Sequence, residues 1–244
     1  MKSLLYLGGL LLLFGASACT VDPQASASSS RPRPQLRADA YNVGILVMDG
    51  VYNTELTAPY DIFQHTLFRE GIRPMNVFTV ANTRAPIRSF EGLYLLADYD
   101  YLRDALPRID ILVVPSAEHH LDTDLEDEVM LDFVRRVGEK ATFVTSHCDG
   151  AFVLAEAGLL EGVASTTFPA DIDAFAERYP DLEVHREVLF VHDGRFITSA
   201  GGAKSFEAAL YLCEHLYGKT VAQQLAEGLV IDWDLTTVPH LIVL

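Results

Sequence analysis

One cysteine stands where an apolar strand pattern changes into a helical one. Residues 141–145 are typical of a buried strand, a helical pattern begins at Ala151, and Cys148 occupies the turn between them. A side chain on such a turn projects above the carboxyl end of the sheet, where helix N–H groups stabilise a thiolate or an oxyanion. Gly150 allows the close backbone approach that the turn needs. We therefore expect Cys148 to be a nucleophile; the alternative, an inert core cysteine, does not explain the turn.

Further polar residues follow a second strand pattern. Residues 109–114 are apolar, and Ser116–Ala117, His119 and His120 come directly after them. The carboxyl ends of parallel strands meet at one edge of a sheet, where ligands commonly bind. These residues are therefore expected near Cys148, although one histidine of the pair could equally belong to an ordinary polar loop.

Two chemistries fit this set of side chains. In the first, His147 or His119 assists Cys148, which attacks a small electrophilic carbon such as that of an isonitrile, an aldehyde or an amide. In the second, histidine and cysteine bind a metal ion that activates water. Adjacent histidines rarely bind one ion, and the sequence has no HxH or HExxH spacing. We therefore expect no metal and no cofactor, with a metal-assisted hydrolase as the weaker alternative.

The composition limits the partners of the protein. The 244 residues include 18 Lys and Arg against 34 Asp and Glu, which gives a formal net charge of −16. So acidic a chain offers little attraction to phosphates, and nucleic acid is not an expected partner. Three cysteines are too few for a disulfide framework or a zinc finger. A small-molecule substrate is the partner that remains.

The first residues have the pattern of an export signal. Residues 1–18 combine Lys2, a short apolar run and small residues before Cys19, which resembles a bacterial lipidation site. A plain secretory signal is the alternative. Residues 19–39 are rich in Ser, Pro and Arg, as in a tether, which leaves 40–244 as the folded domain. We expect an extracytoplasmic lipoprotein that meets the membrane through its lipid anchor only.

Strand and helix patterns alternate along this domain. Such alternation is typical of an α/β fold with a mainly parallel sheet. His192, Asp193 and Gly194 also predict a small β-hairpin that decorates the sheet. The expected strands are 42–48, 109–114, 141–145, 188–191 and 195–198, and the expected helices are 54–70 after an Asn53 cap, 124–137, 151–158, 204–217 and 220–228.

The segment from Cys148 to Gly162 resembles the elbow and following helix of the ThiJ/PfpI superfamily, which has the class I glutamine amidotransferase-like fold. The resemblance extends over Asn42 to Gly218 and is nearest to the branch of isonitrile hydratases and the ligand domains of AraC-type regulators. It implies a flavodoxin-like three-layer sandwich and a possible homodimer. No helix-turn-helix pattern follows Leu244, so a regulator is not expected.

The resemblance also suggests residue roles. It places Glu55 beside Cys148 as a proton carrier, and it implies substrate or oxyanion contacts from Asp149, Gly150 and the turn at Ser116 and Ala117. The alternative for Glu55 is an exposed acid in the first turn of a helix.

One departure from the family pattern weakens the enzyme interpretation. Phe168 stands where many members have a histidine, and a phenyl ring cannot act as a base. We expect a cysteine-dependent hydratase, hydrolase or glyoxalase-like enzyme acting on a small electrophile outside the cytoplasm. The alternative is a ligand-binding or redox-sensing lipoprotein that has kept the fold and lost turnover.

Overall fold

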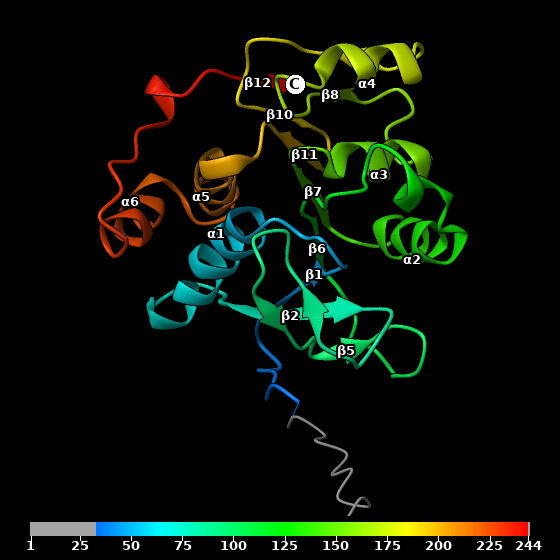
Figure 1. The fold of residues 1–244 in the computed structure, drawn as a ribbon. Coiled ribbons are helices and arrows are strands. Elements are labelled where there is room, and N and C mark those ends of the chain that lie inside the picture. The colour runs from blue at the N-terminus through cyan, green and yellow to red at the C-terminus, as the bar shows by residue number, and fades with distance from the viewer. Residues whose placement is uncertain (1–32, 244) are drawn as a thin grey trace, which may run out of the picture. The chain divides into compact units, whose positions relative to one another are not determined.

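The computed structural model describes residues 33–243 (Figure 1). The predicted signal peptide, Cys19 and the first part of the predicted tether lie outside the described residues. Within the tether, Arg33 is 2.6 Å from Asp104 and the Arg37 amide donates to Asn76. The segment from residue 33 onward therefore already contacts the domain. None of the helices in residues 33–243 has the length and apolar character needed to cross a membrane.

The domain is built on a central sheet of eight strands in the order β12-β10-β11-β7-β6-β1-β2-β5. Strands β11, β7, β6, β1, β2 and β5 run parallel to one another, whereas β10 is antiparallel to β11 and parallel to β12. The strands are β1 (Tyr41–Leu46), β2 (Met75–Ala81), β5 (Tyr99–Asp100), β6 (Ile111–Val114), β7 (Phe143–His147), β10 (Phe190–Asp193), β11 (Phe196–Ser199) and β12 (His240–Val243).

Two short strand pairs lie outside the central sheet. The first pair is antiparallel and the second is parallel. They are β3 (Ile87–Arg88) with β4 (Tyr94–Leu95), and β8 (Ala164–Ser165) with β9 (Glu183–Val184).

Helices cover both faces of the central sheet (Figure 1). Alternate residues of the strands point to opposite faces, so Val43 of β1 joins one apolar core and Leu112 of β6 joins the other. The first core is closed by α1 (Asn53–Gln64), α5 (Ser205–Tyr217) and α6 (Lys219–Glu227), and the second by α2 (Glu128–Gly138), α3 (Gly150–Glu156) and α4 (Ile172–Arg178). The predicted α/β sandwich of three layers, with a mainly parallel sheet, is confirmed.

Several predicted elements differ in place or in extent. The hairpin of β10 and β11 does not decorate the sheet, because β11 pairs with β7 and the hairpin extends the sheet itself. Strands β2 and β12 and helix α4 were not predicted. The last four residues of the described chain thus add an edge strand, since β12 pairs with β10.

The predicted helix caps also differ. The residue before α1 is Tyr52, which provides no side-chain cap, so Asn53 is not the cap but the first helical residue. The predicted helix from Asp124 begins later, because Asp127 accepts hydrogen bonds from the Val129 and Met130 amides and caps α2. A separate 3₁₀ turn (Thr123–Glu126) precedes it.

Candidate active site

Cys148 lies in a sharp turn between β7 and α3. Its backbone φ is +52°, an unusual value for a residue with a side chain, and its N–H donates to the Ser199 carbonyl at 2.9 Å. A Cβ added to Gly150 would lie 2.1 Å from the Val114 carbonyl oxygen. The sequence thus produces the predicted elbow, because Gly150 lets the start of α3 approach β6 closely.

Glu55 reaches the same edge of the sheet from the first turn of α1. Its side chain is buried, and one carboxyl oxygen accepts the Ser116 amide while the other accepts the Gly202 amide, each at 3.0 Å. The carboxyl group therefore joins the turn after β6 to the turn after β11. The exposed first-turn acid that was the alternative interpretation is excluded by this burial.

The residue after the cysteine supplies a second carboxyl group. The Cys148 thiol lies 3.5 Å from Oδ2 of Asp149, to which it can donate its proton. The Thr167 hydroxyl is 3.2 Å from Oδ1 of Asp149 and 3.0 Å from the Cys148 carbonyl, so it can donate to either. Asp149 is therefore held facing the sulfur, with only 6% of its surface exposed.

Burial is the main reason that the pKa values of Cys148, Glu55 and Asp149 are all raised in this site. Burial raises the pKa of the Cys148 thiol, and the negative charges of Glu55 and Asp149 raise it further. Burial also raises the pKa of Glu55, opposed by the amides of Gly202 and Ser116. Burial is again the main reason that the pKa of Asp149 rises to about 7.

These shifts differ from the expectation of a stabilised thiolate. The Asp149 N–H lowers the pKa of the thiol, as a helix start should, but burial and two carboxyl groups outweigh it. The resting Cys148 is therefore a thiol at neutral pH. It contacts a carboxyl group whose pKa of about 7 suits it to accept a proton.

The histidines are not placed as the sequence suggested. His119 is half exposed, with its Nδ1 3.3 Å from Asp122, and no described hydrogen bond joins it to Cys148. His147 is buried, its Nδ1 lies 3.0 Å from the Ser199 hydroxyl, and burial lowers its pKa to about 3. His147 is therefore neutral and adjoins Cys148 along the chain without a described hydrogen bond to its thiol.

The second histidine of the predicted pair is also withdrawn from solvent. His120 is fully buried, its Nε2 lies 2.7 Å from the Met48 sulfur, and burial lowers its pKa to about 3. Among residues 33–243, no three His, Cys, Asp or Glu side chains form a group that could hold a metal ion. The structure therefore brings together Cys148, Glu55 and Asp149 rather than a histidine cluster.

Backbone amides near the elbow can serve an oxyanion. The Ser116 N–H is already bonded to Glu55, so it is not a free donor as the sequence suggested. Within the described residues, the N–H groups of Ala117 and Gly150 donate to no protein acceptor. They are the candidates for stabilising developing negative charge.

The roles of two residues at this site are not predicted by the sequence. The Thr167 hydroxyl lies 3.2 Å from Oδ1 of Asp149, and the Gly202 N–H donates to Glu55. Phe168 itself is 37% exposed. A local signal for Thr167 or Gly202 is absent, because each meets its partner through the packing of distant segments.

Comparison with known proteins relates the sequence to a family. The sequence model of the DJ-1/PfpI family matches residues 41–215. The isonitrile hydratase of Pseudomonas putida is 31% identical over 185 residues, which are 75% of each chain. The HTH-type transcriptional regulator CdhR of Pseudomonas aeruginosa is 32% identical over 146 residues, which are 60% of this chain and 37% of the regulator.

Solved structures share the fold. A ThiJ/PfpI family protein from Pseudomonas syringae superposes with a TM-score of 0.70 at 24% identity, over 84% of both chains. Drosophila melanogaster DJ-1beta superposes with a TM-score of 0.69 at 20% identity, over 80% of this chain and all of its own. Both similarities bear on the three-layer architecture alone.

Proposed function

Because the chain belongs to the DJ-1/PfpI family, we propose that it is a cysteine-dependent enzyme that adds water to a small electrophilic molecule. Isonitriles are the first substrate class to test, since a relative 31% identical to this chain is an isonitrile hydratase. The observation that carries the proposal is the contact of the Cys148 thiol, held on a strained turn at φ +52°, with the Asp149 carboxyl group.

The first step transfers the thiol proton and forms a carbon–sulfur bond. Asp149 accepts the proton of Cys148 as the sulfur attacks the terminal carbon of R–NC. Asp149 then delivers that proton to the same carbon, which gives the thioimidate R–N=CH–S–Cys. The carboxyl pKa of about 7 suits both halves of this transfer near neutral pH.

The second step releases the product. Water attacks the thioimidate carbon, and Asp149 transfers one proton of that water to the nitrogen. The carbon–sulfur bond then breaks as the remaining hydroxyl proton passes through Asp149 to the sulfur, which restores the Cys148 thiol. The product is the formamide R–NH–CHO, so the net reaction adds one water to one isonitrile. Glu55 keeps the Ser116 and Gly202 turns in place around the sulfur, and the Ala117 N–H is free to stabilise developing negative charge.

Turnover of a volatile or soluble isonitrile tests the proposal directly. We expect the purified protein to convert cyclohexyl isonitrile to the formamide, and Cys148→Ser to lose at least about 10³-fold in kcat because oxygen is a far weaker nucleophile here. Cys213→Ser is the matched control, since this second described cysteine is fully buried elsewhere in α5. Turnover retained in Cys148→Ser would exclude the mechanism.

A second candidate is a ligand-binding protein without turnover. It is favoured by the raised pKa of the Cys148 thiol and by Phe168 at the position where the family often has histidine. Under this candidate, the protein would bind an electrophile analogue with equal affinity in wild type and Cys148→Ser, and no isonitrile would be consumed. Formamide production by the wild type decides between the two.

We propose that the protein lies outside the cytoplasm and is tethered through Cys19. The support is the sequence alone: an apolar run with small residues before the cysteine, followed by a tether composition. Incorporation of labelled palmitate into the wild type and its loss in Cys19→Ala would support this location. An unlabelled wild type, or one recovered from the cytoplasmic fraction, would refute it.

A further inference from the structure

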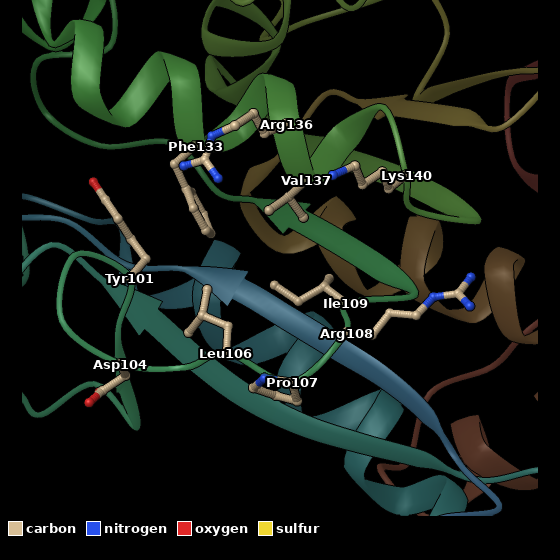
Figure 2. Close-up of a pocket in the computed structure, with 10 residues that line it drawn as sticks. All are labelled: Tyr101, Asp104, Leu106, Pro107, Arg108, Ile109, Phe133, Arg136, Val137 and Lys140. Carbon is tan, nitrogen blue, oxygen red and sulfur yellow. The ribbon is translucent and has the colours of Figure 1, made fainter.

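A pocket lies at the edge of the sheet opposite Cys148. It encloses about 450 Å³ between the second half of α2 and the loop that leads into β6 (Figure 2). Ile109 lines it just before the amino end of β6, whereas Cys148 follows the carboxyl end of the parallel strand β7. The pocket is thus distinct from the candidate active site, and its volume suits a small organic ligand.

One part of the wall of this pocket is apolar. Leu106, Pro107 and Ile109 face Val137 of α2 across the hollow (Figure 2). The Phe133 ring closes one side and is stacked on Tyr101 at 4.2 Å, nearly parallel to it. A wall of this kind favours a ligand with an apolar body, because burying that body releases ordered water.

The mouth of the pocket carries positive charge. Arg108, Arg136 and Lys140 line it, and Lys140 forms no ion pair within the described residues. The one acidic residue among the ten in Figure 2 is Asp104, which is bound by both Arg33 and Arg84. The carboxylate in the lining is therefore already neutralised.

The carboxylates next to the pocket do not cancel the positive charge at its mouth. Asp110 is shared between Arg73 and Arg108, and Arg136 pairs with Asp132 at 2.7 Å. Cations thus outnumber carboxylates at this mouth, although the chain has nearly two acidic residues for each basic one. A local reversal of the overall charge marks a place that attracts anions.

We propose that this pocket binds a small amphipathic anion, a monocarboxylate with a medium-length apolar body. The body lies against Leu106, Ile109 and Val137, and the carboxylate meets Arg136 and Lys140 at the mouth. The cations also offset the negative end of the α2 dipole, which by itself would disfavour an anion there. Apolar contact and charge are both required, so neither an alcohol nor a short acid satisfies the site.

Calorimetry with matched probes tests the ligand class on the full-length protein. We expect octanoate to bind, with an affinity that falls as NaCl is raised from 20 to 300 mM because the ion contacts are screened. Octan-1-ol and acetate should each bind at least about tenfold more weakly than octanoate. Octan-1-ol lacks the negative charge, and acetate lacks the apolar body. Equal binding of octanol, or no binding of octanoate, would overturn the proposal.

Charge variants test the location. The double variant Arg136→Gln with Lys140→Gln should weaken octanoate binding at least about tenfold, and Lys140→Arg should retain it. The control removes two positive charges elsewhere, Arg178→Gln with Lys219→Gln, and should leave the affinity unchanged. If both double variants weaken binding equally, the effect is one of net charge and the pocket assignment is wrong.

The experiment is independent of the proposed reaction. Cys148→Ala should bind octanoate as the wild type does, because the pocket lies at the other edge of the sheet. Binding lost in Cys148→Ala would show that octanoate occupies the candidate active site instead, and would overturn the assignment to this pocket. Failure of isonitrile turnover has no bearing on either result.

Discussion

Gly201 packs directly against Cys148: a Cβ atom at residue 201 would lie 2.3 Å from the Cβ of Cys148 and 2.6 Å from its backbone nitrogen. Gly201 also has a φ of +75°, a conformation that other residues rarely adopt. The turn after β11 therefore forms one wall of the elbow. The strained geometry of Cys148 depends on a glycine more than fifty positions away along the chain.

Replacing Gly201 should displace this elbow. We expect Gly201→Ala to lower the free energy of unfolding by roughly 2–4 kcal/mol and to abolish turnover, because the new methyl group overlaps the cysteine. Gly202→Ala is the matched control: its φ is also positive, at +55°, but its Cβ would meet open space. It should cost only about 1 kcal/mol. Urea unfolding checks both, and equal losses would contradict the packing argument.

Replacing Asp149 should lower turnover but increase the reactivity of the Cys148 thiol. Asp149→Asn removes the proton acceptor, so kcat should fall roughly 10²–10³-fold. It also removes a negative charge that raises the pKa of Cys148, so iodoacetamide should alkylate this cysteine faster at pH 8. The measurement uses protein with Cys19 and Cys213 changed to Ala. Parallel loss of turnover and alkylation would point to simple misfolding of the site.

The stability of the fold should also depend on pH through Asp149. Folding raises its pKa from an ordinary 3.8 to about 7, so between these values the folded state keeps a proton that the unfolded chain has released. The free energy of unfolding therefore falls as pH rises from about 4 to 7, by roughly 2–4 kcal/mol. Asp149→Asn should flatten this slope in urea unfolding at pH 4.5, 6 and 8. An unchanged slope would assign the dependence to other groups.

Glu55 should support both stability and turnover, because it holds the two turns beside Cys148. In Glu55→Gln one oxygen remains to accept a hydrogen bond, so the N–H of either Ser116 or Gly202 loses its acceptor. We expect a loss of about 1–3 kcal/mol in unfolding free energy and roughly 10²-fold in kcat. The exposed Glu161→Gln is the control. Wild-type behaviour of Glu55→Gln would remove Glu55 from the mechanism.

Thr167 should tune the pH dependence of turnover. Its hydroxyl lowers the pKa of Asp149, so Thr167→Val should move the rising limb of the kcat profile to higher pH. Thr167→Ser, which keeps the hydroxyl, should restore the original midpoint. A uniform fall in kcat without a shift of the midpoint would indicate that Thr167 only supports the backbone.

Local patterns were enough to predict the layers of this fold. The apolar runs of β1, β6 and β7 and the helices between them are encoded in short stretches, since strand and helix periodicities are local properties. The two-residue strand β5 is too short for such a pattern, and the edge strand β12 is an apolar run of only three residues after His240. These strands form because they pair with neighbouring strands, and such pairing cannot be predicted from a short stretch of sequence.

The elbow at Cys148 was also accessible from the sequence, because a strand, a small-residue turn and a helix follow one another within ten residues. The position of Glu55 near this elbow was implied only by the family resemblance. The protonation state of Cys148 could not be predicted from the sequence. Whether Cys148 is a thiol depends on burial and on two carboxyl groups, and whether His119 or His147 assists depends on side-chain direction and exposure. Desolvation and charge act over distances in space, so only the tertiary structure decides them.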